Sequence, residues 1–472
     1  MYKLETIISL AKRRGFVFQS SEIYGGLNGC WDYGPLGVEL LLKIKDSWWK
    51  AMTFRDDIEG VDASILMHPR TWDASGHTKQ FSDPMIDNKV SKARFRADNL
   101  IEEHIVKLRS KNKNDEAEAI EQKLANIKEN NDYLTIILEH GIKDPVSGTV
   151  EWTEVRNFNL MFKTFIGPLE EASSVVYLRP ESAQGIFVNF KNVAETARQK
   201  VPFGIAQIGK AFRNEINTKN FLFRTREFEQ MEMQYFVKPG AELEWFDYWK
   251  KQRWQWYIDM GMDESKMRWK NHDKLAHYAN HAVDIEFEFP FGWGEIEGIH
   301  SRTDFDLRNH QEFSGKKMEY VDAVNNERYL PFVVETSGGV SRGLMAFLCN
   351  AYSEEQVTDD KGNTEVRTIL RFSPKLAPIT AAVFPLVNKD GMPELAQSVY
   401  RDLQKSMKVQ YDSSGAIGRR YRRQDEIGTP FCITIDGESL TENTVTIRER
   451  DSMKQDRISI DKIKNYISDK IY

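Results

Sequence analysis

Residues 205–236 alternate between polar and apolar side chains on both sides of a short basic segment. In the first half, Gln207 and Arg213 fall on one face, while Ile208 and Phe212 fall on the other. The second half alternates in the same way and places an aromatic ring among hydrogen-bonding groups: Phe228, Gln230, Glu232 and Gln234. Because successive side chains of a strand point to opposite faces, this pattern predicts a β-hairpin with one polar face.

Apolar residues recur at a spacing of four after Pro35, which predicts a helix with one apolar stripe. The stripe consists of Leu36, Leu40, Ile44, Trp48 and Met52. This spacing is expected both of a core helix and of a helix at an interface, so both interpretations stay open. The next segment, VDASILMHP at residues 61–69, is predicted to form a strand that ends at Pro69.

Two further segments are predicted to be insertions of mainly helical character, at about residues 88–150 and 240–290. Within the first, residues 98–140 are rich in Glu, Lys and Asn with spaced Leu and Ile, a composition typical of solvated helices. The second contains WFDYWKKQRWQWYIDMGM, which predicts an aromatic-rich helix packed in the core.

The pattern changes after Pro374. A strand, a helix and three further strands follow in order, and a helix is predicted at residues 461–471. Strands alternating with a crossover helix indicate a small α/β domain. We therefore expect one large domain over residues 1–373 and a second over residues 374–472.

Composition narrows the class of protein. A chain of 472 residues with 40% hydrophobic and 12% aromatic residues is expected to form two or more globular domains. The three cysteines are scattered and suit a reducing compartment, so a cytoplasmic location is expected. No secretory segment opens the sequence and no apolar run approaches the length of a membrane span.

The net charge of −6 argues mildly against a nucleic-acid partner, but residues 375–472 carry 16 Lys and Arg against 14 Asp and Glu. A run of arginines in this part surrounds Tyr421: Arg419, Arg420, Arg422 and Arg423. The run fits equally well a patch that binds phosphates and stacks a base, or a solvated cluster paired with Asp425 and Glu426.

The polar face of the hairpin carries groups that suit a nucleotide. Arg213 can form two hydrogen bonds to a phosphate, a planar base can lie on Phe228, and Glu215 can accept a hydrogen bond from an exocyclic amine. Lys219, Arg224 and Arg226 add positive charge in and beside the connecting segment. For a short Phe-Arg-x-Glu sequence alone, a surface hairpin with solvated charges would be the preferred interpretation.

The full stretch from residue 205 to residue 236 resembles motif 2 of the class II aminoacyl-tRNA synthetases, and RTREFEQMEMQYF is similar to the glycyl-tRNA synthetase form of that motif. Residues 33–69 resemble motif 1, which forms the dimer interface in that class, and residues 330–348 resemble motif 3. The resemblance implies an α+β fold, in which helices flank an antiparallel sheet and the C-terminal α/β domain binds the anticodon.

The resemblance also implies the residues of the site. The catalytic residues would be Arg213 and Arg342. The residues implied for ATP are Arg213, Asn214, Glu215, Phe223, Arg224, Thr225, Arg226, Glu227, Phe228, Glu295, Ile296, Gly339, Val340, Ser341 and Arg342. The residues implied for glycine are Arg96, Glu181, Phe228, Glu229, Gln230, Met231, Glu232, Glu335, Thr336, Ser337, Gly338 and Gly339.

Magnesium is the expected metal. Glu295 and Glu297 are predicted to project from the same side of one strand, where Glu295 would contact magnesium through ATP. For Glu297 a structural salt bridge fits equally well. His277 and His281 have a spacing of four that would allow two zinc ligands on a helix, but Tyr278 stands where a catalytic glutamate is expected, so no zinc is expected.

The implied function is ATP-dependent attachment of glycine to tRNA(Gly) through glycyl-adenylate, with release of pyrophosphate and AMP, by a homodimer. No segment has the character of an editing domain, and none is needed, because no amino acid is smaller than glycine. Three alternatives are a synthetase for another amino acid, a catalytically inactive RNA-binding relative, and a zinc hydrolase built on the two histidines.

Overall fold

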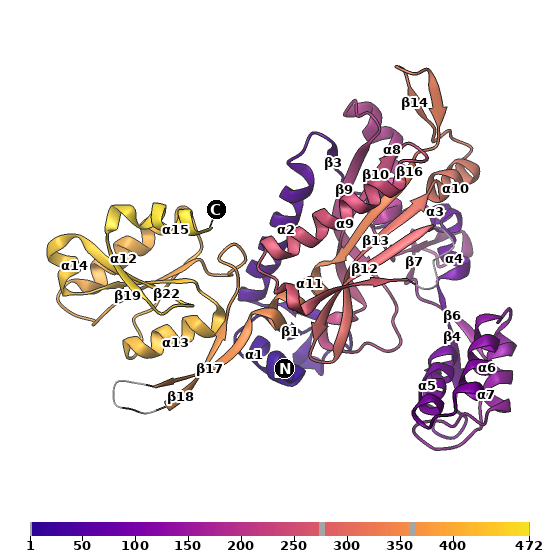
Figure 1. Ribbon diagram of the computed structural model, residues 1–472, viewed down its shortest axis with the longest axis horizontal. Helices are drawn as coiled ribbons and strands as arrows, with labels where there is room; N and C mark the ends of the chain where they lie inside the picture. Colours follow the sequence, from indigo (N-terminus) through magenta and orange to yellow (C-terminus); the bar gives the residue numbers. More distant parts are fainter. Residues whose placement is uncertain (1, 273–278, 359–361, 363, 472) are drawn as a thin grey trace. The chain divides into compact units, whose positions relative to one another are not determined.

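A computed structural model describes residues 2–272, 279–358, 362 and 364–471 (Figure 1). The chain divides into two compact units. The first unit combines residues 1–65 with residues 181–472, and the second consists of residues 66–180.

A seven-stranded sheet forms the centre of the first unit. Its strands in spatial order are β11 (Met267–Asn271), β12 (His281–Phe289), β13 (Gly292–Thr303), β16 (Phe332–Gly339), β10 (Glu227–Val237), β9 (Phe203–Phe212) and β3 (Ile58–Gly60). All neighbours are antiparallel except β3 and β9, which are parallel. The predicted hairpin is therefore the β9–β10 pair, in which Gln207 lies opposite Glu232.

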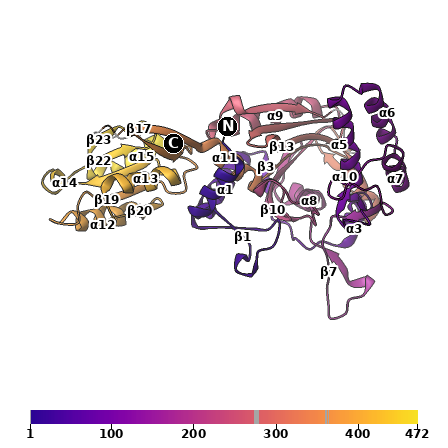
Figure 2. The ribbon, with the colours of Figure 1, turned by 90° about the horizontal axis from the view of Figure 1, so that it is seen from below.

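The alternation of side chains gives this sheet one apolar face and one polar face. The helices on the apolar face are α2 (Pro35–Thr53), α9 (Glu242–Asp259) and α11 (Val340–Ala351). The helices at one end of the polar face are α8 (Ala183–Thr196) and α10 (Phe305–Ser314). Figure 2 shows α9 and α8 on opposite sides of the sheet. The rest of the polar face is left uncovered by these helices.

The apolar stripe of α2 belongs to the core. Leu40, Ile44, Trp48 and Met52 are fully buried, and Leu36 is nearly so. Pro35 occupies the first helical turn, where its missing N–H costs nothing. The structure thus decides between the two interpretations of the stripe in favour of packing within the chain.

The strand predicted at residues 61–69 is wrong. The strand is β3, which ends at Gly60. The backbone N–H of Ala63 donates to the side-chain Oε1 of Gln207 instead of to a neighbouring strand. Pro69 begins a short helix, α3 (Pro69–Ala74).

The C-terminal part of the first unit is a five-stranded sheet with helices, of which the sequence predicted four strands, the crossover helix and the terminal helix. Its strands in spatial order are β20 (Val409–Tyr411), β19 (Ala381–Pro385), β21 (Phe431–Ile435), β22 (Thr444–Glu449) and β23 (Gln455–Ser459). Its helices are α12 (Met392–Leu403), α13 (Ile417–Ile427), α14 (Gly437–Glu442) and α15 (Ile463–Ile471). The pairs β19–β20 and β19–β21 are parallel and the others antiparallel.

The arginine run lies on α13 and does not form a single patch. Arg420 is buried and donates to the backbone oxygens of Gly415 and Pro385. Tyr421 packs against Phe384 with ring centroids 5.5 Å apart, and the guanidinium of Arg448 lies 4.9 Å from the centroid of its ring. A helix separates its side chains by about 100° per residue, which is why neighbouring arginines point in different directions.

The second unit has its own core. Its three-stranded sheet has the order β5 (Arg94–Arg96), β4 (Ser82–Asp87) and β6 (Arg156–Asn159). Three helices pack with it: α5 (Ala97–Ser110), α6 (Asn114–Ala125) and α7 (Asn130–Glu139). They account for the spaced Leu and Ile of residues 98–140, whose polar faces are exposed. Within the described residues of both units, none of the helices combines the length and apolar character needed to span a membrane.

Candidate functional site: a polar cleft on the main sheet

The uncovered polar face of the sheet forms a cleft of about 440 Å³. It is lined by Glu181, Arg213, Glu215, Leu222, Phe223, Arg224, Thr225, Phe228, Gln230, Glu232, Glu295, Gly298, His300, Arg302, Glu335, Ser337, Gly339, Ser341 and Arg342. Strands β10, β13 and β16 supply more than half of these residues because alternate residues of a strand share one face, and Arg213 follows directly after β9. The cleft therefore has positive charge at one end and carboxylates at the other.

Two arginines with stacked guanidinium groups lie at the positive end. The guanidinium of Arg213 lies 5.3 Å from the ring centroid of Phe228, and that of Arg342 lies 4.4 Å from Phe223. Arg342 also contacts Glu295, with 3.2 Å between Nη1 and Oε1. Stacking fixes the direction of a planar fork, so these two cations are held ready for an anion with several oxygens.

The beginning of α11 adds to the positive end. Arg342 lies in its first turn, directly after strand β16. Ser341 accepts a hydrogen bond of 2.7 Å from the hydroxyl of Tyr33, which fixes this turn. Unpaired amides and the dipole at a helix N-terminus favour negative charge. A polyphosphate is therefore the ligand that suits this end.

A buried acidic cluster forms the other end. Arg302 donates to both carboxylate oxygens of Glu335 at 3.1 and 3.2 Å and to Asp306 at 2.9 and 3.1 Å. Burial would raise the pKa of Glu335, but Arg302 and a hydrogen bond with His300 outweigh it and lower the pKa to about 2. Glu335 is thus a permanent anion in the cleft.

Glu232 has the opposite electrostatic environment. Its carboxylate accepts hydrogen bonds from Ser337 at 2.8 Å and from Gln230 at 3.1 Å. Burial, together with the negative charges of Glu335 and Glu181, raises its pKa to about 7. Between pH 4.5, the ordinary pKa of a glutamate, and about pH 7, Glu232 keeps its proton in the folded chain and loses it in the unfolded chain. The free energy of unfolding therefore falls as pH rises through that window.

Some predicted site residues do not line the cleft. Four of them lie on the opposite, buried face of their strands: Met231, Ile296, Thr336 and Gly338. Val340 is buried at the beginning of α11. Glu227 and Glu229 share the face of Met231 and pair with Lys210 and Lys45. Alternation explains the result, because a resemblance that covers consecutive residues includes both faces of a strand.

Two loop residues of the prediction also lie outside the cleft lining. They are Asn214 and Arg226, of which Arg226 donates to the backbone oxygen of Glu215 at 3.0 Å. Arg224 lines the cleft and forms a salt bridge of 3.0 Å with Glu215. The cations of this segment therefore divide between fixing the loop and facing the cleft.

The expectation that Glu295 and Glu297 share one side is wrong. Opposite Ile285 and Glu286 the register of β13 shifts, so that Ile296 is an extra residue in a β-bulge. Glu295 consequently lines the cleft, whereas Glu297 is fully buried on the other face, where Arg253 donates to it at 2.6 and 3.2 Å. The salt-bridge interpretation of Glu297 is confirmed.

Arg96 lies in the second unit, where it pairs with Asp83 at 2.9 Å and with Asp98 at 2.6 Å. Its assignment to glycine stays a prediction. His277 lies outside the described residues, and His281 begins strand β12, so the helical spacing expected for this pair does not hold at His281.

The sequence analysis missed four residues that line the cleft: Leu222, Gly298, His300 and Arg302. Strict alternation counted from Glu295 would place Gly298, His300 and Arg302 on the opposite face, and the β-bulge at Ile296 brings them to the cleft. Leu222 lies in a one-turn helix of the connecting segment, and its sequence carries no signal for the cleft.

Comparisons with known proteins extend this description. Residues 164–351 match the family described as "tRNA synthetase class II core domain (G, H, P, S and T)". Residues 380–470 match "Anticodon binding domain", and residues 83–117 and 106–160 match "Glycyl-tRNA synthetase insertion domain 1".

Curated relatives are similar over nearly the whole chain. A protein of Chlorobaculum tepidum named "Glycine--tRNA ligase" is 56% identical over 99% of this chain and 100% of its own length. Proteins of the same name from Treponema denticola and Staphylococcus haemolyticus are 55% and 52% identical. These alignments cover 96% and 99% of this chain, and 94% and 99% of the respective relatives.

Proposed function

The chain belongs to the glycine–tRNA ligase family, and from this premise we infer that it attaches glycine to tRNA at the expense of ATP. The observation that supports this most directly is the division of the cleft. Two arginines that lie against phenylalanine rings are at one end, and a buried acidic cluster is at the other. ATP supplies phosphates for the first end, and the ammonium group of glycine suits the second.

We propose that the chemistry proceeds in two steps. The glycine carboxylate attacks the α-phosphorus of ATP, forming glycyl-adenylate and releasing pyrophosphate, and a terminal ribose hydroxyl of tRNA(Gly) then takes the glycyl group and releases AMP. No side chain acts as a nucleophile. Arg213 would stabilise the charge that develops at the α-phosphate, and Arg342 would bind the outer phosphates.

Magnesium fits the same end of the cleft. Glu295 is partly exposed there and presents carboxylate oxygen, the ligand type that magnesium prefers. When bound through ATP, the ion would neutralise charge on the phosphate oxygens. Glu295 is the residue proposed to hold it.

The acidic end explains a preference for a small amino acid. Glu335 and Ser337 from β16 and Glu181 before α8 all line the cleft, and the first two are fixed by hydrogen bonds to Arg302 and Glu232. We propose that these groups bind the glycine ammonium and leave no space for a β-carbon. An additional methyl group that meets fixed, close-packed atoms is excluded by repulsion.

Amino-acid-dependent exchange between ATP and radioactive pyrophosphate tests the proposed function. The full chain should exchange pyrophosphate with glycine, and alanine and serine should support a rate at least about two orders of magnitude lower. Transfer of radioactive glycine to tRNA(Gly), compared with an unrelated tRNA, tests the second step. Exchange supported best by another amino acid would transfer the assignment to that amino acid, and no exchange with any amino acid would favour the inactive relative.

The pKa of Glu232 predicts a pH dependence of glycine binding. Glycine should bind better to the ionised carboxylate, so KM for glycine in the exchange reaction should fall as pH rises through about 7. About one pH unit below that value, KM should be about tenfold higher, because one carboxylate in ten is ionised. A Glu232→Gln variant should show a high KM without this dependence, whereas an unchanged profile in the variant would assign the titration to another group.

We also propose that the chain forms a homodimer in the cytoplasm and that the C-terminal domain contacts the anticodon of tRNA(Gly). Exposed apolar side chains on α2 and directly after it support the dimer: Leu42 and Phe54. Sedimentation at about twice the chain mass of 54.8 kDa would agree with a dimer, and a monomer at micromolar concentration would contradict it.

A further inference from the structure

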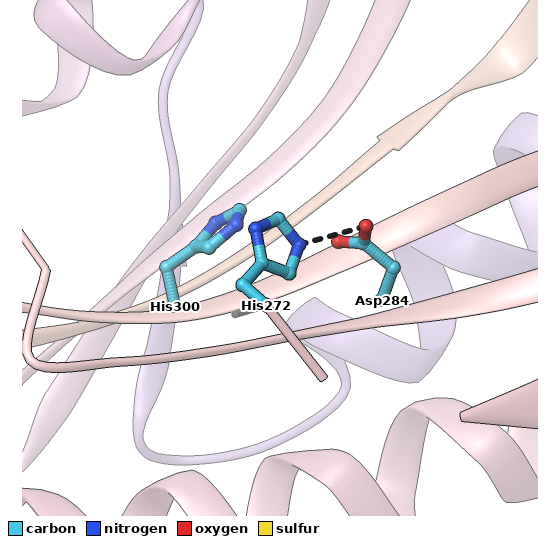
Figure 3. A group of neighbouring side chains, drawn as sticks. All are labelled: His272, Asp284 and His300. Carbon is cyan, nitrogen blue, oxygen red and sulfur yellow. Dashed lines mark hydrogen bonds and ion pairs between the residues drawn. The ribbon is translucent and has the colours of Figure 1, made fainter. Parts of the chain in front are cut away.

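Two histidines and an aspartate meet beside the acidic end of the cleft. His272 directly follows β11, Asp284 lies on β12 and His300 lies on β13 (Figure 3). One nitrogen or oxygen atom of each lies within 4.8 Å of the others. His272 is bonded to Asp284 with 2.8 Å between Nε2 and Oδ2. Three neighbouring strands thus bring three potential metal ligands together.

His300 is already oriented as a metal ligand usually is. Its Nδ1 lies 3.0 Å from Oε1 of Glu335, the residue directly opposite it on β16. Histidines that bind metals commonly donate their second ring nitrogen to a carboxylate in this way, which fixes the ring and makes the other nitrogen a better ligand. The other nitrogen of His300, Nε2, is left for a different partner.

Gly298 lies next to two of the candidate ligands, His300 and Asp284. A β-carbon at this position would lie 3.3 Å from Nε2 of His300 and 3.4 Å from Oδ1 of Asp284, and only 2.7 Å from Cε1 of the same ring. The His300 ring therefore packs directly against Gly298, and a larger residue at position 298 would displace the ring.

We propose that His272, Asp284 and His300 bind one divalent transition-metal ion of the zinc and cobalt type. Two imidazoles with one carboxylate select such ions, because magnesium and calcium prefer sites made of oxygen alone. Bonds of about 2.0 to 2.1 Å place the ligand atoms of a tetrahedral ion about 3.3 Å apart, so side-chain rotations that close the widest separation by up to about 1.5 Å and open the His272–Asp284 pair by about 0.5 Å complete the site. Three ligands leave a fourth position for water.

The site is connected to the cleft but does not depend on the proposed reaction. His300 lines the cleft and contacts Glu335, so a cation bound at Nε2 would act on the anion proposed to bind the glycine ammonium. A structural or regulatory ion would use this connection without entering the chemistry. The alternative arrangement is a metal-free relay in which the aspartate simply bridges the two rings.

Metal titration of the full chain separates these arrangements. The chain, free of any histidine tag and dialysed against a chelator, is titrated with Co²⁺ followed by visible absorption and with Zn²⁺ followed by calorimetry, in excess Mg²⁺. We expect one equivalent of each ion to bind. A His272→Ala variant should lose at least about tenfold in affinity, the scale measured when a metal site loses a supporting group, and Asp284→Asn should also bind more weakly.

His281 provides the matched control, because it is an exposed histidine at the start of β12 that does not belong to the group. His281→Ala should bind both ions as the unaltered chain does. Absence of stoichiometric binding, or binding that His272→Ala leaves unchanged, would overturn the proposal, as would a loss confined to His281→Ala. Pyrophosphate exchange is measured separately, so failure of metal binding would leave the proposed function untouched.

Discussion

Replacement of Arg213 by alanine is expected to lower glycine-dependent pyrophosphate exchange by at least about two orders of magnitude, the scale measured when one preorganised donor is removed from a transition-state charge. Arg213 follows β9 on the polar face, where its guanidinium is stacked against Phe228 at 5.3 Å. Negative charge grows at the α-phosphate during attack, so the loss should appear mainly in kcat and less in KM for ATP. Steady-state exchange at several ATP concentrations measures both.

Lys210 gives the control for this substitution. It is a cation of the same strand, but it points to the other face and pairs with Glu227 at 2.8 Å. Lys210→Ala removes the same charge from β9 and should leave the exchange rate within about twofold, because an exposed ion pair contributes little. Near-normal exchange in Arg213→Ala, or an equal loss in both variants, would show that Arg213 does not act at the α-phosphate.

Replacement of Arg302 by alanine is expected to have the largest effect on stability. The side chain is almost completely buried and bridges Glu335 and Asp306 through four hydrogen bonds. Its removal leaves two buried carboxylates without their cation, a change that typically costs about 3 to 5 kcal/mol. The urea concentration at which tryptophan fluorescence reports unfolding should fall accordingly, and the pKa of Glu335 should rise.

An exposed pair on the same segment provides the comparison. Arg308 and Asp304 are also four residues apart in sequence, but the arginine side chain is 54% exposed. Arg308→Ala should therefore change the free energy of unfolding by less than about 1 kcal/mol. If both variants unfolded at the same urea concentration, the buried arginine would not be an important support of the cleft.

The alternatives to glycine–tRNA ligation have lost most of their support. A catalytically inactive relative is expected to lack the residues proposed for ATP, yet Arg213, Glu215, Phe228 and Arg342 line one cleft together. The zinc hydrolase was built on a helical histidine pair, of which one member lies outside the described residues and the other begins a strand. The proposed metal site consists of His272, Asp284 and His300, and no hydrolytic reaction is proposed for it.

The sequence by itself determined which side chains of the hairpin share a face. Alternation is a local property of an extended chain, so the polar row of Gln207, Phe228 and Glu232 could be predicted without knowing any partner strand. The change of pattern after Pro374 likewise indicated strands β19 to β22 and helix α12, and the resemblance to known motifs pointed to the two arginines.

Only the tertiary structure decided the acidic end of the cleft. The bulge at Ile296 changes the face of the residues that follow it in β13, which places Glu297 in the core and sets Gly298 and His300 into the cleft. The pairing of His300 with Glu335 joins positions 35 residues apart. Register between strands depends on contacts between residues that are distant in sequence, and the pattern within one strand does not determine those contacts.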